Sequence, residues 1–208
     1  SRDGIHGRLD ANATPITLSI EDANADLQVL SFTGREALNE PFRFDLELVS
    51  ARPDLKLEEL LHKRACLTFG ATGEGKIHGQ VYRIEQGDSG KTLTRYSISL
   101  MPQLAYLQHN HDQQIFQQLT VPKIIAQVLE DRGILSDAYS FQLGAEYPER
   151  EYCVQYDESD LHFIQRLCEE EGIHFHFQHS ANAHKLVFGD DQTVFPKLAP
   201  VPYQQDSG

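Results

Sequence analysis

The sequence has no apolar run long enough to cross a membrane. A membrane-spanning helix needs about 20 consecutive apolar residues, and no stretch of the 208 residues approaches that length. Residues 1–10 are polar and lack the apolar core of a secretory signal. We therefore expect a chain with neither a membrane-spanning segment nor a visible export signal.

Positive charge is also scarce. The chain has 18 Lys and Arg against 31 Asp and Glu, a net charge of -13. Proteins that bind nucleic acids or anionic membranes use an excess of Lys and Arg to meet the phosphates. Both classes of partner are therefore disfavoured, whereas an acidic surface suits docking to a basic protein face.

Cysteine is rare and shows no pairing pattern. The three residues, Cys66, Cys153 and Cys168, include no CxxC spacing, and their number is odd. This pattern predicts free, mostly buried thiols made in a reducing compartment. The hydrophobic fraction of 40% and the charged fraction of 24% predict a folded chain with one substantial core or two small ones.

Residues 16–107 have the alternating pattern of β-strands. Ile16, Leu18 and Ile20 alternate with polar residues, and residues 42–49 alternate even more strictly. One or two helical turns are predicted within 55–62, and a chain reversal at Gly87-Asp88-Ser89-Gly90. The region is predicted to form an antiparallel barrel or sandwich, with further strands at 27–33, 65–69, 76–85 and 92–100.

Helical spacing appears after a boundary that we place near 105–120. Pro122 suits the first position of one helix, with Val121 kept outside it, and Gly133 suits its end. A second helix is predicted from Asp157, as its cap, to Glu171. Strands are expected around this helix, at 152–156, 174–177 and 185–188, which makes the fold class a β-rich α+β.

A glycine-rich stretch, Gly70 to Lys76, has the spacing of a phosphate-binding loop. That motif needs a Ser or Thr after the lysine and a following helix. Ile77 replaces the hydroxyl residue, and the sequence continues as a strand. The favoured interpretation is a hairpin turn.

Histidines gather near the end of the chain. His174 and His176 lie two apart on a predicted strand and so share a face, with His179 and His184 nearby. A zinc site needs three or four ligands, so we favour ordinary packed histidines over a metal site. His109 and His111 are weighed the same way.

No catalytic or cofactor-binding constellation emerges from the rest of the sequence. Adjacent acidic residues such as Asp190 and Asp191 point apart rather than into a cleft. No G-x-S-x-G element is present. The acids Glu169 to Glu171 oppose the helix dipole at the helix end. They are interpreted as a solvated end or, less favoured, as a contact for a basic partner.

One long segment resembles a known family. Residues 150–179, REYCVQYDESDLHFIQRLCEEEGIHFHFQH, are similar to a signature stretch of VgrG proteins, the spike proteins of type VI secretion systems. Four further landmarks follow the order of that family, so the likeness covers about residues 16–190. They are residues 39–50 (NEPFRFDLELVS), 57–61 (LEELL), His78-Gly79, and IFQ at 115–117 followed by VPKII at 121–125.

The resemblance implies a structural hub and not an enzyme. It implies a homotrimer of the phage baseplate hub type that docks on a hexameric Hcp tube and on baseplate proteins. A PAAR-repeat tip and effectors would be carried through regions absent here. Assembly would take place in the bacterial cytoplasm, followed by secretion through the type VI machine.

The implied organisation has four parts. Residues 1–15 would be a flexible lead-in, 16–107 the first barrel of the hub, 108–195 an α/β region with two helices and part of a second barrel, and 196–208 a linker and truncation point. Two alternatives stay open: a zinc-dependent hydrolase using His174 and His176, and the hub of a contractile phage tail.

Overall fold

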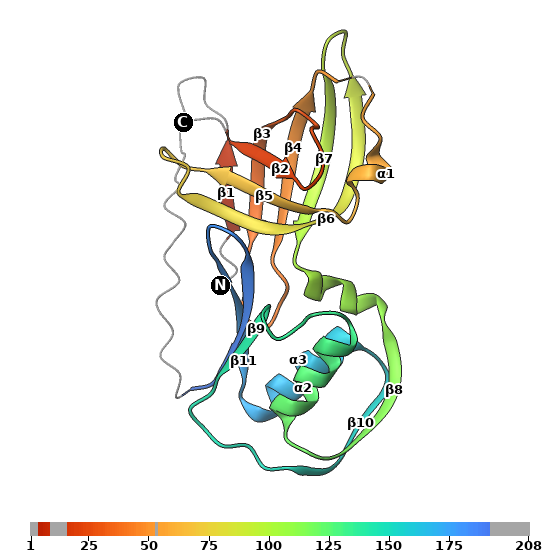
Figure 1. Ribbon diagram of the computed structural model, residues 1–208, viewed down its shortest axis with the longest axis vertical. Helices are drawn as coiled ribbons and strands as arrows, with labels where there is room; N and C mark the ends of the chain where they lie inside the picture. Colours follow the sequence, from red (N-terminus) through yellow and green to blue (C-terminus); the bar gives the residue numbers. More distant parts are fainter. Residues whose placement is uncertain (1–3, 9–15, 53, 192–208) are drawn as a thin grey trace.

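Six antiparallel strands close into a barrel that forms the first lobe of the chain (Figure 1). The computed structural model describes residues 4–8, 16–52 and 54–191. The pairing order is β1-β3-β2-β5-β6-β7-β4, and an additional β3–β4 pairing closes the ring. β1 adds to β3, and a single helical turn, α1 (Leu57–Leu60), lies between β4 and β5. The strands are β1 (Gly4–Arg8), β2 (Thr17–Ile20), β3 (Leu27–Arg35), β4 (Arg43–Ser50), β5 (Arg64–Phe69), β6 (Gly75–Ser89) and β7 (Thr94–Met101).

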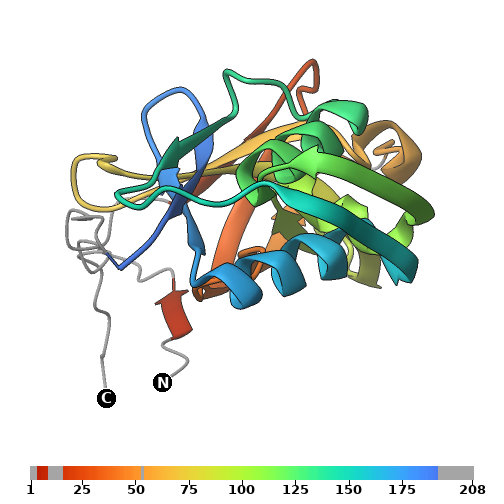
Figure 2. The same cartoon turned by 90° about the horizontal axis from the view of Figure 1, so that it is seen from below.

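The second lobe combines helices with two small sheets. β8 and β10 form a two-stranded antiparallel ribbon, and β11, β12 and β9 form a second sheet in which β9 is parallel to β12. Figure 2 shows α3 and the ribbon as neighbours in this lobe. The elements are η1 (Gln103–His109), β8 (His111–Leu119), α2 (Val121–Asp131), β9 (Tyr139–Gln142), β10 (Arg150–Ser159), α3 (Asp160–Glu171), β11 (His174–His179) and β12 (His184–Gly189).

The period-two predictions are confirmed. In β2 and β4 alternate side chains point into the barrel, so Leu18, Ile20, Phe44, Leu46 and Leu48 are all buried. The apolar side of the second helix is buried as well; it consists of Leu161, Phe163, Ile164, Leu167 and Cys168. The α+β class and the antiparallel barrel are therefore as predicted.

Both helix starts differ from the prediction. Helix α2 begins at Val121 and not at Pro122, because the Thr120 hydroxyl caps it by accepting from the Lys123 amide at 3.4 Å. Proline has no amide proton to lose, so the second position suits it as well as the first.

Asp157 does not cap α3. It lies in an irregular part of β10 with a φ of 47°, and the strand continues to Ser159. The Ser159 hydroxyl caps the helix instead, accepting from the His162 amide at 3.0 Å. Asp160 is therefore the acid in the first helical turn, whereas Glu158 belongs to the strand.

Two further predictions need correction. Residues Gly4–Arg8, assigned to a flexible lead-in, form β1 and pair with β3. The reversal predicted at residues 87–90 comes later: β6 runs to Ser89, and the Gly90 amide donates to the Leu93 carbonyl at 2.8 Å. The remainder of the lead-in and the predicted linker at 196–208 lie outside the described residues.

A buried carboxylate fastens the second lobe. Asp160 is 2% exposed and accepts from the Arg132 Nε at 2.6 Å and from the Gln155 Nε2 at 2.7 Å. Its amide donates to the Asn110 carbonyl at 2.7 Å. One residue thus connects α3 with α2, the ribbon and the end of η1.

Replacing Asp160 with alanine should cost about 2 to 4 kcal/mol of unfolding free energy, because Arg132 and Gln155 would lose their buried acceptor. Urea unfolding of the purified chain measures the change. Asp54→Ala is the control, since it removes only an exposed pair with Arg52 and should cost less than about 1 kcal/mol. Equal costs for the two substitutions would contradict this role of Asp160.

Candidate functional site at the junction of the two lobes

The connection between β3 and β4 reaches from the barrel to the second lobe, and Asn39 is its central contact. The Asn39 amide donates to the Phe175 carbonyl at 2.9 Å, and the Asn39 side-chain oxygen accepts from the Phe175 amide at 2.8 Å. Gln165 on α3 donates to the Asn39 carbonyl at 2.8 Å. Asn39 has a φ of 64°, a conformation that Asn tolerates better than most residues.

Aromatic packing seals the same junction. The ring of Phe42, which is 1% exposed, has its centroid 5.1 Å from that of Phe177, 4.9 Å from His179 and 5.6 Å from His184. The rings of Phe177 and His184 are nearly perpendicular to that of Phe42, at 86° each, and the ring of His179 is inclined at 62°; edge-to-face arrangements of this kind are preferred by aromatic rings. Phe42, Phe44, Phe175 and Phe177 are all buried.

The predicted histidine cluster is divided between different partners. His179 Nε2 lies 2.8 Å from a Glu36 carboxylate oxygen, and His174 Nε2 lies 3.2 Å from one of Asp191. His176 is 6% exposed. Within the described ranges, no three His, Cys, Asp or Glu residues are grouped so that they could hold a metal ion. A zinc-dependent hydrolase would need such a group.

Burial controls the charge of two of these rings. It lowers the pKa of His184 to about 4, helped by the nearby charges of His179, His78 and Arg64. Burial lowers the pKa of His176 as well, against an opposing effect of Glu36. At neutral pH both imidazoles are therefore uncharged, and His184 acts as a packing group.

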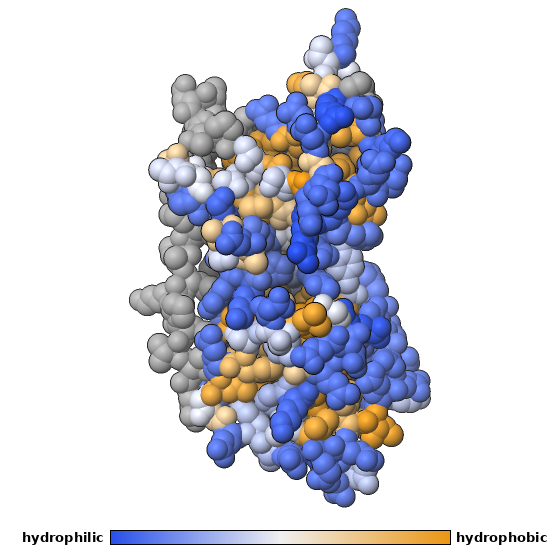
Figure 3. Space-filling view, in the orientation of Figure 1, coloured by the Kyte–Doolittle hydropathy of each residue, from blue (hydrophilic) through white to orange (hydrophobic). Residues whose placement is uncertain are grey.

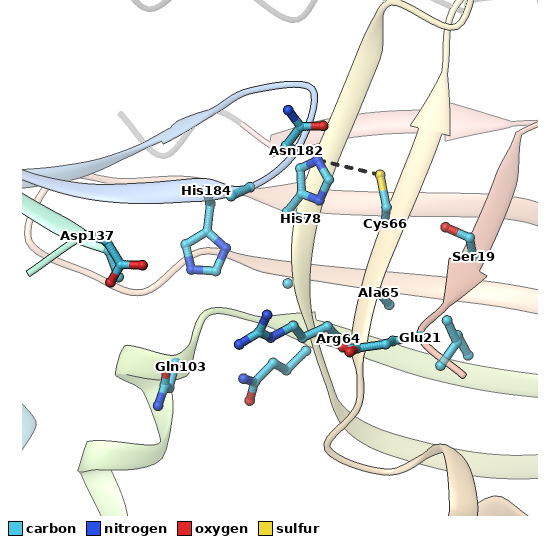
Figure 4. Close-up of a pocket in the computed structure, with 15 residues that line it drawn as sticks. Ser19, Glu21, Arg64, Ala65, Cys66, His78, Gln103, Asp137, Asn182 and His184 are labelled. Atoms are coloured by element: carbon cyan, nitrogen blue, oxygen red, sulfur yellow. Dashed lines mark hydrogen bonds between the residues drawn. The ribbon is translucent and has the colours of Figure 1, made fainter. Parts of the chain in front are cut away.

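A pocket of about 420 Å³ opens at the junction (Figure 4). Strands β2, β5 and β6 line one side, and residues of η1 and of the β11–β12 turn line the other. Cys66 Sγ lies 3.8 Å from His78 Nε2, which also lies 3.1 Å from the Ala181 carbonyl. A carbonyl only accepts, so this nitrogen carries a proton and cannot take one from the thiol. Cys66 and His78 therefore do not form an activated nucleophile.

The other two cysteines, Cys153 and Cys168, are buried. As predicted, all three cysteines of the chain are free thiols. Burial raises the pKa of Cys153, although Arg150 opposes the shift, and raises that of Cys168 to about 12. Neither thiol has the depressed pKa of a nucleophile.

The glycine-rich stretch is a hairpin turn, as favoured. It joins β5 to β6, and the Glu74 carboxylate accepts from the Thr72 amide at 2.8 Å and from its hydroxyl at 2.6 Å. These hydrogen bonds, led by the one from the Thr72 hydroxyl, lower the pKa of Glu74. The Thr72 amide, which a bound phosphate would need as a donor, is therefore already hydrogen-bonded to the Glu74 carboxylate.

The acidic end of α3 is solvated at Glu169 and Glu170, which are exposed, but Glu170 and Glu171 are also paired with arginine within the chain. Arg150 binds Glu170 at 2.8 Å and Glu171 at 2.6 Å, while Arg166 binds Glu158 at 2.6 Å and Glu170 at 2.8 Å. Burial raises the pKa of Glu170 and of Glu158, but their arginine partners outweigh it and both pKa values are lowered. These carboxylates are ion-paired inside the chain.

The two histidines near the start of the second lobe are not brought together with the others. His109 lies in η1 and contacts the Tyr82 hydroxyl, and His111 pairs with Ser159 in the ribbon. Among the described residues, none of the helices combines the length and apolar character required to cross a bilayer.

Comparison with known proteins identifies the family. The model of the phage tail baseplate hub family matches residues 35–208. The type VI secretion spike protein VgrG4b of Pseudomonas aeruginosa is 62% identical over 95% of this chain, and VgrG5 of the same organism is 60% identical over 95%. The chain spans about a quarter of the length of these relatives, 24% and 25% respectively.

Solved structures agree with this assignment. The Escherichia coli c3393 protein is a type VI secretion component described as structurally similar to the T4 phage tail proteins gp27 and gp5. It superposes with a TM-score of 0.81 at 33% identity, over 85% of this chain and 49% of that one. A prophage tail protein from Shewanella oneidensis shares the fold, with a TM-score of 0.55 at 15% identity over 84% of this chain and 54% of that one. The chain therefore belongs to the phage tail baseplate hub family, among the VgrG spike proteins of type VI secretion.

Proposed function

We propose that this chain is a load-bearing part of a type VI secretion hub, which trimerises and docks on the hexameric Hcp tube. In that position it supports the needle, its PAAR-repeat tip and the effectors. The spike is assembled in the bacterial cytoplasm and leaves through the machine. The identity of 62% to VgrG4b across 95% of the chain is the observation that carries this proposal.

The construction of the chain supports a mechanical role. The six-stranded ring leaves none of its own strands with a free edge, which favours a rigid body. The two lobes are connected by hydrogen bonds at Asn39 and by the packing of Phe42. Residues 108–195 would contribute to a second barrel that other parts of the hub complete.

Relatives favour secretion over a phage tail. Identity reaches 60–62% with the two Pseudomonas spike proteins but only 15% with the Shewanella prophage protein. The hydrolase alternative has no comparable support, since among the described residues no three His, Cys, Asp or Glu side chains are grouped around His174 and His176 to hold a metal ion.

Removing residues 16–191 from the spike gene of a type VI-active strain should abolish release of Hcp into the medium, because the tube would lose its docking hub. Immunoblotting of culture supernatants measures the release. The intact gene on a plasmid is the control and should restore it. Normal Hcp release by a strain whose only spike gene carries the deletion would refute the hub function.

The junction should also weaken in acid. The pKa of His184 in the folded chain is about 4, below the ordinary value of about 6.5. As the pH falls from about 6.5 to about 4, His184 becomes protonated in the unfolded chain but stays neutral in the folded chain, so the free energy of unfolding decreases over that window. The loss should approach about 2 to 3 kcal/mol.

Chemical denaturation at a series of pH values tests this expectation. His184→Gln removes the titrating ring and should flatten the pH dependence between about 4 and 6.5. The matched control is His111→Gln, because His111 is an exposed residue at the start of β8. An unchanged slope in His184→Gln would show that other groups set the acid sensitivity.

A further inference from the structure

One arginine of the junction pocket has no acidic partner within the part of the chain that the structure describes. Arg64, at the start of β5, lines the pocket of about 420 Å³ and forms no ion pair there. An unpaired guanidinium beside a pocket is available to bind an oxyanion. Seven other arginines are paired with Asp or Glu of the chain: Arg35, Arg43, Arg52, Arg83, Arg132, Arg150 and Arg166.

Side-chain amides lie next to this arginine. Gln80 of β6 and Gln103 of η1 line the same pocket, and within the described residues neither side-chain amide is hydrogen-bonded to the chain. Figure 4 shows the Arg64 guanidinium directed toward the side of the pocket where Gln103 lies. A glutamine amide offers N–H donors and a carbonyl acceptor, which complement the carbonyl and N–H of a peptide group. The lining therefore suits a ligand that contains peptide groups.

The pocket also presents an acidic group that is not paired with Arg64. Asp137, in the loop before β9, is exposed, lines the pocket and has no basic partner among the described residues. A ligand with a carboxylate at one end and an ammonium at the other matches both groups. A phosphate would instead meet repulsion from Asp137 and from Glu21, which lines the pocket as well. On the face shown in Figure 3, the surface where the two lobes meet is mainly hydrophilic, in keeping with a charged ligand.

We propose that the junction pocket binds a short free peptide, with its carboxylate on Arg64, its ammonium on Asp137 and its peptide groups on Gln80 and Gln103. The volume of about 420 Å³ is within the range of about 300 to 1,000 Å³ that is usual for small-molecule sites. The two glutamines also line a neighbouring cavity of about 240 Å³, so an elongated ligand suits the site better than a compact one. This peptide site is separate from the hub function and does not rest on it.

Titration of the isotope-labelled 208-residue chain with triglycine, followed by the NMR shifts of backbone amides, tests the proposal. We expect saturable shifts of residues that line the pocket. Two matched probes each remove one charge: N-acetyl-triglycine lacks the ammonium, and triglycine amide lacks the carboxylate. Each should bind about tenfold more weakly than triglycine, because each loses a charge-assisted hydrogen bond.

Substitutions assign each end of the peptide to its partner. Arg64→Gln should weaken the binding of triglycine about tenfold but leave that of triglycine amide unchanged, because the amide has no carboxylate to lose. Asp137→Asn should weaken triglycine similarly and leave N-acetyl-triglycine unchanged. Arg95→Gln is the control, since Arg95 on β7 is exposed and lies outside the pocket lining. Thermal unfolding of the three variants verifies that they fold.

Three results would overturn the proposal: no saturable binding of triglycine, equal affinities for triglycine and its two capped forms, or equal effects of Arg64→Gln and Arg95→Gln. Equilibrium dialysis of radiolabelled triglycine against the complete spike adds a fourth test. Retained binding supports the site, whereas lost binding would mean that the rest of the hub fills the pocket and would overturn it. None of these results bears on the Hcp-release test, which deletes the whole region, so the peptide site and the hub function can fail separately.

Discussion

The arrangement of the two lobes depends on one short connection, residues 36–42 between β3 and β4. Asn39 provides directional hydrogen bonds to β11 and α3, Glu36 pairs with His179, and Phe42 packs under the rings of β11 and β12. Hydrogen bonds fix orientation while buried aromatic area supplies most of the adhesion. The buried side chains of the barrel and of the α/β lobe thereby form one continuous core, which holds the two lobes as one body.

Strand and helix periodicity revealed much of this fold in advance. The side chains of β4 and the apolar stripe of α3 each face a single core, so their sequence repeats with the period of the element. The strands β8 and β9 escaped prediction for the opposite reason. β8 alternates a buried Phe116 with an exposed Ile115, and β9 has four residues and pairs with β12, more than 40 positions along the chain. Only tertiary contact determines such strands.

The interpretation of the candidate site failed where partners are distant in sequence. Proximity in sequence suggested that His174, His176, His179 and His184 could act together. His179 instead contacts Glu36, which lies 143 residues earlier in the chain. Glu170 and Glu171 likewise find Arg150 at 20 and 21 residues' separation. A single sequence specifies the residue types but not these pairings, so the family resemblance carried the functional inference.

Ion pairing also explains why the surface of this chain is suited to selective contact. Arg132, Arg150 and Arg166 are each held by carboxylates of the chain itself. These three arginines are thus neutralised within the chain, and acids exceed bases by 31 to 18 overall. An acidic surface of this kind favours contact with a basic protein face and disfavours anionic partners such as nucleic acids.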